Sequence, residues 1–476
     1  MTNAIDTSKE NAAPAPAPAP KKLMATAQLL FAISLANKRI RGFHDPDTDA
    51  MDNSGPNVGK STYGVRDGTI YKFVDSHWEA QEVDKLERDA IDWLSTEAPD
   101  KCTDKTAISC VNTAVRKLRL IPTAKTNVIP LKYCSLEVAT DGELIKRESL
   151  CEDGLTYCLS CDYEKDAVPE RFLKFIHEAL PNEEVRNFLQ EYVGYTLLSD
   201  TRFQVGAWLL GVGGSGKGTI TQIAQALHRH TVALSLDALD GFKLAGLHSA
   251  SLVVIDETPA RINEQTLKTL VSGDTAQIDR KFRDPLTLRP TAKWIICGNS
   301  LPSISDHSVG FWRRWFIFPF DVVPSKKQPL LAQQIIDEEL SGVLNWALEG
   351  LQRLLKRNGF PDQPPEMRHA ASNGKMQSNN VAAWVQDMGI VTIENRHEDD
   401  DGNPIFGAPR IPVANTRKDI YAAYTRWCGE SGTRAVASNK FWERLRLVLP
   451  DIREDRRGSG AERAYHVNIP LPSIND

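Results

Sequence analysis

The stretch GVGGSGKGT, residues 211–219, constrains the fold of this chain more than any other feature. An apolar run, FQVGAWLLG, leads into it, and GTITQIAQALHRH follows it with the spacing of an amphipathic helix. A strand that delivers a glycine-rich loop to a helix N-terminus presents backbone N–H groups to phosphate. The chain is therefore expected to be an α/β protein with a phosphate-binding loop, and its expected cofactors are ATP and Mg²⁺.

The loop departs from the usual pattern at one position. Gly218 follows Lys217 where a hydroxyl residue normally stands, and Thr219 comes one residue later. We expect Lys217 to bind phosphate and Thr219 to bind Mg²⁺, an order that also resembles adenylate kinases. A nucleotide kinase is therefore one alternative. Nucleotide contacts are expected along the whole loop, at Gly211, Gly213, Gly214, Ser215, Gly216, Lys217, Gly218 and Thr219.

A second loop, SGPNVGKS at residues 54–61, has a similar pattern in different surroundings. HDPDTDAMDN precedes it instead of an apolar strand, and TYGVRDGTIYKF follows it instead of a helix. A phosphate-binding loop needs both neighbours, so we interpret this segment as a polar loop. The upstream carboxylates Asp45, Asp47 and Asp49 do not form a calcium loop either, because Ala50 stands where glycine is required.

Polar residues follow or precede three further apolar segments. In SLVVIDE, Asp256 is expected to bind Mg²⁺ and Glu257 to polarise the attacking water, a group that a nucleotide kinase does not need. Asn299, at the end of TAKWIICGN, could hold that water or sense the γ-phosphate. Arg313 and Arg314 stand among aromatic residues in GFWRRWFIFPF, a setting that suits an arginine finger.

As an ordered set, these motifs resemble superfamily 3 helicases, in particular the phage, plasmid and poxvirus primase-helicase family. The resemblance rests on QEYVGYTLLSDTRFQ, GVGGSGKGT, VVIDE, LKTLVSGDTAQIDRKFR, IICGNSLP, RRWFIFPF and LSGVLNWALEGL. It implies an AAA+-like ATPase core and an ATP-dependent replicative DNA helicase of a mobile element. Relatives of this kind form rings, usually hexameric, and translocate 3′ to 5′ on single-stranded DNA.

The resemblance also implies roles for individual residues. Arg314, or else Arg313, would be a finger that reaches the neighbouring subunit, which makes a homo-oligomeric ring necessary. The family's DNA-contacting hairpin falls at DRKFR, where Lys281 is the first candidate and Arg280 and Arg283 flank it. A solvated charge run is the alternative for this segment. No primase domain is expected here, so a separate primase or polymerase is a candidate partner.

The chain divides into five expected segments. They are an Ala/Pro-rich tail (1–22), a mixed α/β domain (23–166), the ATPase domain with a helical lid (167–358), a linker (359–380) and a winged-helix-like DNA-binding domain (381–476). LLAQQIIDEELSGVLNWALEGLQRLLKR, at the end of the ATPase domain, is expected to form a pair of helices.

In the last segment, SNKFWERLRLVLP is the expected recognition helix, with Ser438 as its cap and Phe441, Leu445 and Val448 facing inward. The expected DNA contacts of this segment are Lys440, Arg444, Arg456 and Arg457. A module for contacts between subunits is the alternative.

Composition does not separate the two functions that the motifs and the resemblance leave open. A net charge of −5 neither indicates nor excludes DNA binding, and no segment resembles a membrane span or a signal peptide. Eight scattered cysteines fit a reducing, cytoplasmic setting, and we interpret Cys158 and Cys161, with Cys134 and Cys151 upstream, as free thiols. A helicase on single-stranded and forked DNA is the first hypothesis. An ATP-switched origin-binding initiator or loader without processive unwinding is the alternative.

Overall fold

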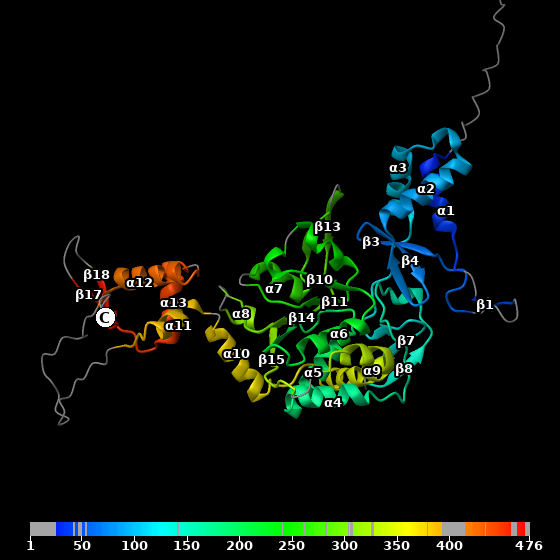
Figure 1. The fold of residues 1–476 in the computed structure, drawn as a ribbon. Coiled ribbons are helices and arrows are strands. Elements are labelled where there is room, and N and C mark those ends of the chain that lie inside the picture. The colour runs from blue at the N-terminus through cyan, green and yellow to red at the C-terminus, as the bar shows by residue number, and fades with distance from the viewer. Residues whose placement is uncertain are drawn as a thin grey trace, which may run out of the picture.

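The structure, a computed structural model, divides into three parts that follow one another along the chain (Figure 1). It describes residues 25–40, 43–45, 50–52, 55–139, 142–239, 241–259, 262–280, 283–302, 304, 308–324, 328–377, 379–392, 415–433, 435–457 and 464–471. The expected tail at 1–22 therefore lies outside the described residues. None of the helices that the structure describes is both long and apolar enough to cross a membrane.

The N-terminal part combines three helices with short antiparallel strands, and its mixed α/β character is as the sequence predicted. The helices are α1 (Ala27–Asn37), α2 (Val83–Glu97) and α3 (Asp104–Lys117). The strands are β1 (Phe43–Asp45), β2 (Ala50–Asp52), β3 (Tyr63–Arg66), β4 (Thr69–Val74), β5 (His77–Ala80), β6 (Val128–Pro130), β7 (Ser135–Val138) and β8 (Leu144–Arg147). They pair in the order β1-β2, β3-β4-β5 and β6-β7-β8, all antiparallel.

A parallel five-stranded sheet forms the central part, in the order β10-β11-β14-β9-β15. Its strands are β9 (Gly206–Leu210), β10 (Thr231–Ala233), β11 (Leu252–Ile255), β14 (Lys293–Gly298) and β15 (Trp315–Pro319). The surrounding elements are α4 (Glu170–Ala179), α5 (Glu183–Thr196), α6 (Lys217–Leu227), α7 (Glu264–Ser272), the hairpin β12 (Ala276–Arg280) and β13 (Arg283–Leu288), α8 (Val309–Trp312) and α9 (Leu331–Arg357).

Both faces of this sheet are covered, which explains why its strands are apolar without alternation. On one face Ala207, Leu209 and Phe316 pack with side chains of α4, α5, α6 and α9. On the other face Trp208 and Trp315 pack with α7, α8 and the β12–β13 hairpin. The sheet is thus the middle layer of an α/β core, and its strand ends are where polar groups become accessible.

Two predictions around this core are wrong. Residues 331–357 form the single helix α9, not a pair of helices. Its Gly342 and Gly350 serve close packing, since an added Cβ at Gly342 would lie 2.7 Å from the nitrogen of Pro169. The expected linker contains helix α10 (Pro365–Gln377), which packs against β15 and buries Met367.

The C-terminal part has an element order that is compatible with the expected winged helix. It consists of α11 (Asn380–Asp387), β16 (Asn415–Thr416), α12 (Arg417–Glu430), α13 (Ser438–Val448), β17 (Glu454–Arg457) and β18 (Ala464–Val467). Phe441 and Leu445 are buried, as predicted, whereas Val448 is half-buried. Ser438 is the first helical residue and not the cap. The cap position belongs to Ala437, whose side chain has no oxygen to accept the bond.

Candidate functional site

The glycine-rich loop lies between the end of β9 at Leu210 and the start of α6 at Lys217, as the sequence predicted. Gly211 and Gly216 have φ values of +150° and +97°. A Cβ at Gly211 would collide with the carbonyl oxygen of Phe320, and one at Gly216 would lie 2.8 Å from the ring of Phe175. Both positions therefore require glycine, because the backbone turns where neighbouring segments approach closely.

Lys217 holds its amino group inside the loop. Nζ donates hydrogen bonds to the carbonyl oxygens of Gly211 (2.7 Å) and Val212 (2.8 Å) and lies 3.4 Å from Oδ1 of Asn299. Burial lowers the pKa of Lys217, while the charge of Asp321 acts in the opposite direction. Sequence reasoning missed Asp321, although a carboxylate two residues beyond an apolar strand was a readable signal.

A cavity of about 610 Å³ opens over the loop. Its wall includes residues 213–219 of the loop, Gln222 of α6, Asn299, and Phe175 and Glu178 of α4. This volume is in the range of small-molecule and cofactor sites. Thr219 lines the cavity, and a Cβ at Gly218 would meet nothing within 4 Å. The loop thus has a hydroxyl at 219 and open space at 218.

The strand order brings the predicted polar residues to the same edge of the sheet. Strand β14 lies between β9 and β11, so Asn299 follows β14 beside the loop, and Asp256 and Glu257 follow β11 one strand further. Thr258 fastens this turn by donating from Oγ1 to the carbonyl oxygen of Cys297 at 2.8 Å. Asp256 and Glu257 are exposed at the edge and do not form part of the cavity wall.

Arg313 and Arg314 lie at the opposite edge. They precede β15, in which Trp315 pairs with Gly206 and Pro319 with Leu210, so they stand beside the start of β9. The five residues of β15 separate them from the loop edge by roughly 16 Å. Arg314 Nε donates to Ser272 Oγ at 2.7 Å, and its Nη1 donates to the carbonyl oxygen of Gly310. Arg313 is exposed.

The predicted DNA-contacting segment forms a β-hairpin. Strands β12 and β13 are antiparallel, and Arg280 pairs with Arg283 at the end of the ladder beside the turn. Lys281, the first candidate, lies outside the described residues, as do the side chains of Arg280 and Arg283. The hairpin rises from the core near α7 and β10 in Figure 1. Its DNA contacts stay a prediction.

In the C-terminal part, one predicted DNA contact is wrong. Arg444 is buried, and its guanidinium donates to Oδ1 of Asn380 (3.3 Å) and to the carbonyl oxygen of Ile304 (3.2 Å). It therefore joins α13 to the central part and cannot reach a DNA backbone. Lys440 is exposed beside Glu443.

The two basic residues predicted for the wing are Arg456 and Arg457, and the structure describes the side chain of Arg456. Arg456 is exposed, with its guanidinium 5.5 Å from the ring centre of Tyr465. The side chain of Arg457 lies outside the described residues. Arg456 is thus placed where a basic wing could meet DNA, and that role stays a prediction.

The second glycine-lysine loop and the cysteines, which the sequence analysis did not assign to a site, have structural interpretations. Residues 55–61, the described part of the second loop, lead into strand β3 and not into a helix, and Lys60 pairs with Glu152 at 2.7 Å, so the interpretation as a polar loop is confirmed. Cys151, Cys158 and Cys161 are buried free thiols, and Cys134 is a half-buried one.

Comparison with known proteins matches part of this chain to a family model and to distant relatives. Residues 209–314 match a family described as a family of unknown function (DUF5906). A protein of Acanthamoeba polyphaga mimivirus named "Putative helicase L207/L206" is 23% identical over 193 residues. That match covers 37% of this chain and 20% of the viral protein, so it spans about a fifth of the relative's length.

Solved structures of the NrS-1 C-terminal region align along most of the chain. The A form apo structure has a TM-score of 0.43 at 12% identity, covering 85% of this chain and 94% of that one. An apo structure of residues 305–718 of the same region has a TM-score of 0.39 at 10% identity, with coverage of 84% and 94%.

Proposed function

We propose that this chain is an ATP-dependent DNA helicase of the ring-forming superfamily 3 type, with an AAA+-like core. One observation carries the proposal: the nucleotide loop and the arginine pair lie on opposite edges of one parallel sheet. The distant similarity to the viral protein named "Putative helicase L207/L206" supports the same function. We place the activity in the replication of a phage, plasmid or related mobile element, in the cytoplasm of the host.

The loop edge has the groups that ATP hydrolysis needs. Lys217 faces the cavity and would bind the β- and γ-phosphates, and Thr219 and Asp256 would hold Mg²⁺. Glu257 would polarise the attacking water, and Asn299, 3.4 Å from the lysine amine, would orient it or sense the γ-phosphate. The exposed positions of Asp256 and Glu257 leave room for a second subunit to close the site.

The opposite edge holds an arginine pair, whereas no arginine lines the cavity among the residues that the structure describes. An arginine about 16 Å from its own loop cannot stabilise its own γ-phosphate, because that distance exceeds the reach of a side chain. It can do so for a neighbour whose loop edge faces it. Such a contact is head-to-tail, and head-to-tail contacts close into a ring when the rotation allows. We propose a hexamer, with Arg313 as the finger because it is the exposed member of the pair.

DNA would pass through the centre of this ring. The β12–β13 hairpin would contact the phosphates of one strand through Lys281, flanked by Arg280 and Arg283. Translocation is proposed to run 3′ to 5′. The C-terminal part, with Lys440 and Arg456 exposed, is proposed to bind the duplex of the fork, and a separate primase or polymerase is the proposed partner.

Strand displacement on forked DNA tests the proposal. We expect the full chain with ATP and Mg²⁺ to displace a labelled strand when the fork has a 3′ single-stranded tail, and Lys217→Ala to abolish displacement. Lys60→Ala is the matched control, because it removes a lysine from the other GK-containing loop, outside the proposed site. Its displacement rate should equal that of the wild type.

The other outcomes distinguish the alternatives. ATP hydrolysis and DNA binding without displacement on any fork would identify an initiator or loader. Transfer of phosphate from ATP to AMP would identify a nucleotide kinase. Either result would replace the helicase proposal.

A further inference from the structure

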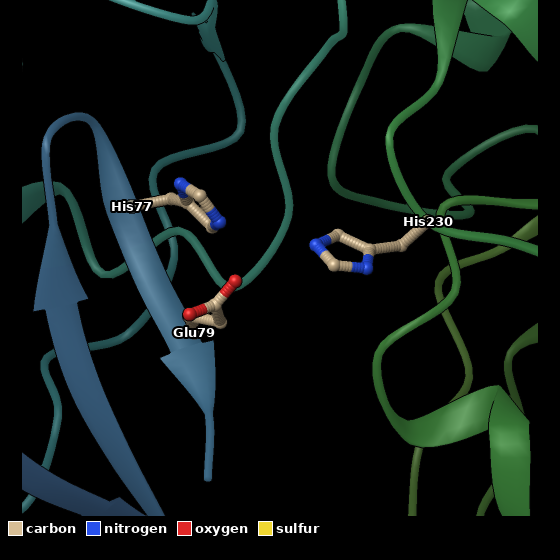
Figure 2. A group of neighbouring side chains, drawn as sticks. All are labelled: His77, Glu79 and His230. Carbon is tan, nitrogen blue, oxygen red and sulfur yellow. The ribbon is translucent and has the colours of Figure 1, made fainter.

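We propose that His77, Glu79 and His230 form a binding site for a divalent transition-metal ion, with Zn²⁺ as the first candidate. Figure 2 shows the three side chains pointing into one gap, His77 and Glu79 from β5 and His230 from the segment that follows α6. One ligand atom of each residue lies within 4.8 Å of those of the other two. The site is independent of the proposed helicase function.

Local structure explains how residues so distant in sequence meet. His77 and Glu79 are two apart on a strand and therefore project from the same face of β5. His230 is held opposite them by two backbone hydrogen bonds, from Arg229 N to Cys158 O (3.2 Å) and from Ser251 N to His230 O (3.0 Å). The two imidazole centres are 6.1 Å apart.

This spacing is close to what a metal requires. A tetrahedral ion with bonds of about 2.0–2.1 Å holds its ligand atoms about 3.3 Å from one another. Ligand atoms that lie within 4.8 Å of each other thus need to close by about 1.5 Å at most. Rotation of the Glu79 and His230 side chains, both half-buried, can supply that movement.

His77 provides the second indication of a ligand. It is 1% exposed, and within the part of the chain that the structure describes its Nε2 has no hydrogen-bond partner. Nδ1 lies 3.5 Å from Oγ of Ser76, at the limit of a hydrogen bond. A buried polar nitrogen without a partner is costly, and a coordinated ion would remove that cost.

The protonation state of the histidines suits coordination. Burial lowers the pKa of His77 to about 3, and the positive charge of Arg229 acts in the same direction. Burial also lowers the pKa of His230, again with Arg229. Both shifts favour the neutral imidazole, which is the form that binds metal ions.

The donor set and its surroundings favour an ion of intermediate softness, such as Zn²⁺, that keeps one coordination position free. Two imidazole nitrogens and one carboxylate are ligands of Zn²⁺ sites that keep a fourth position free. Arg229 contacts Oε1 of Glu79 at 3.4 Å, which leaves Oε2 for the ion. Glu79 and His230 also line a cavity of about 600 Å³, whose wall includes Glu82, Lys85 and His248, so two of the three proposed ligands border accessible space.

Occupancy of the site would join two parts of the molecule. Strand β5 belongs to the N-terminal part, whereas His230 lies three residues beyond the last residue of α6, the helix of the phosphate-binding loop. An ion held by both would fix the N-terminal strands against the end of that helix. We therefore expect metal binding to stabilise the folded chain.

Zinc titration of the full chain tests the site. After treatment with a chelator and dialysis, Zn²⁺ is titrated in competition with a chromophoric chelator. We expect one equivalent per wild-type chain and a loss of affinity of at least about 100-fold in His230→Ala and in His77→Ala, since even outer-shell changes cost 10–100-fold. His369→Ala, an exposed histidine of α10, is the control and should bind like the wild type.

Thermal unfolding with and without Zn²⁺ supplies an independent readout. The ion should raise the Tm of the wild type and of His369→Ala but not that of His230→Ala, which removes a half-buried side chain and is expected to fold even where His77→Ala does not. Wild-type protein without a zinc equivalent at micromolar concentration overturns the proposal, and so does an unchanged affinity in His230→Ala.

Discussion

The two edges of the central sheet each hold a lysine, and the lysines differ in what they can do. At the carboxyl edge, Lys217 donates to the carbonyl oxygens of Gly211 and Val212 beside an open cavity. At the amino edge, Lys293 donates to the carbonyl oxygens of Leu198 and Thr291 and is 1% exposed. Both amines have similar partners, but only Lys217 can exchange a carbonyl for an incoming phosphate. Accessibility, and not hydrogen bonding, thus separates Lys217, which is proposed to bind phosphate, from the structural Lys293.

The same comparison applies to the arginines. Arg314 at the amino edge is tied to Ser272 and Gly310 of its own chain, whereas Arg313 beside it is exposed. Among the residues that the structure describes, no arginine lines the cavity at the carboxyl edge, whereas the amino edge has an exposed arginine at a distance from that cavity. A single chain cannot join the two edges, so the comparison implies that two subunits do.

The largest expected effect tests that implication. Arg313→Ala should lower ATP hydrolysis on the order of 10³-fold, the cost of losing an arginine finger, while ATP affinity stays unchanged because the loop is intact. Steady-state hydrolysis and binding of a fluorescent ATP analogue measure the two quantities. Arg314→Ala should instead lower the Tm, since it removes bonds within the chain.

Mixing of variants separates a finger in trans from one in cis. Arg313→Ala has a complete loop but no finger, and Lys217→Ala has a finger but no working loop. Each alone should be nearly inactive, whereas mixed assemblies should contain some complete interfaces and regain part of the hydrolysis. Co-assembly without any recovery would contradict the head-to-tail contact of the two edges.

Much of this arrangement could be read from the sequence because strand ends are visible in it. Asp256, Glu257 and Asn299 follow apolar runs and Arg313 precedes one, so a parallel sheet places the carboxylates and the arginine at opposite edges. What could not be read depends on contacts between distant segments. Arg444 lies four residues after the exposed Lys440, so the sequence alone places both side chains on the same face of α13. Only the packing of Arg444 against Ile304 in the folded chain shows that Arg444 is buried. His77 and His230 meet through the fold alone.

The second-largest expected effect concerns Thr219, the proposed Mg²⁺ ligand at the carboxyl edge. Thr219→Ala should raise the Mg²⁺ concentration needed for hydrolysis on the order of 100-fold, about 2.7 kcal/mol, because no hydroxyl would then follow Lys217 at the start of α6, and Ser215 Oγ is engaged with the carbonyl oxygen of Val212. A Mg²⁺ titration of ATP hydrolysis measures the change. Normal Mg²⁺ dependence in this variant would show that Thr219 is not a ligand.

Gly218 offers a rescue. A Cβ at this position meets nothing within 4 Å, so serine fits there and would put the hydroxyl directly after Lys217. Gly218→Ser combined with Thr219→Ala should regain most of the Mg²⁺ affinity. Without rescue, the effect of Thr219→Ala would have to come from helix packing.

The burial of Lys293 at the amino edge predicts how the free energy of unfolding depends on pH. Burial lowers the pKa of Lys293 from its ordinary 10.5 to about 7. Between these values the unfolded chain binds a proton that the folded chain does not, so the free energy of unfolding rises with pH through this lysine, by at most about 1.36 kcal/mol per pH unit. Below pH 7 both states are protonated and this contribution to the slope disappears.

Lys293→Met should remove that contribution, because methionine does not titrate. The measurement is the slope of unfolding free energy against pH between 7 and 10, compared with the wild type and with Lys356→Met, an exposed lysine of α9. Equal slopes in all three proteins would mean that Lys293 is protonated in the folded chain. The slope is the readout because absolute stability also changes with packing.

The smallest expected effect concerns the hairpin, which also rises from the amino edge. Lys281→Ala should weaken binding of single-stranded DNA several-fold and reduce by about one the slope of log affinity against log salt, as the loss of one phosphate contact does. Hydrolysis without DNA should not change. Lys105→Ala, which removes an exposed lysine of α3, is the control for net charge.

Strand β14 connects the β12–β13 hairpin at the amino edge with the carboxyl edge of the sheet. The hairpin ends at Leu288 and leads into β14 at Lys293, and the far end of β14 is followed by Asn299 beside the glycine-rich loop. One strand thus connects the proposed DNA contact with the proposed γ-phosphate sensor. If it couples them, Lys281→Ala should lose the stimulation of hydrolysis by DNA, and Asn299→Ala should lose hydrolysis while keeping its affinity for DNA. If DNA still stimulates hydrolysis in Lys281→Ala, the alternative interpretation of DRKFR as a solvated charge run would be favoured. The proposed contact between subunits would then be the one remaining proposed function of the amino edge.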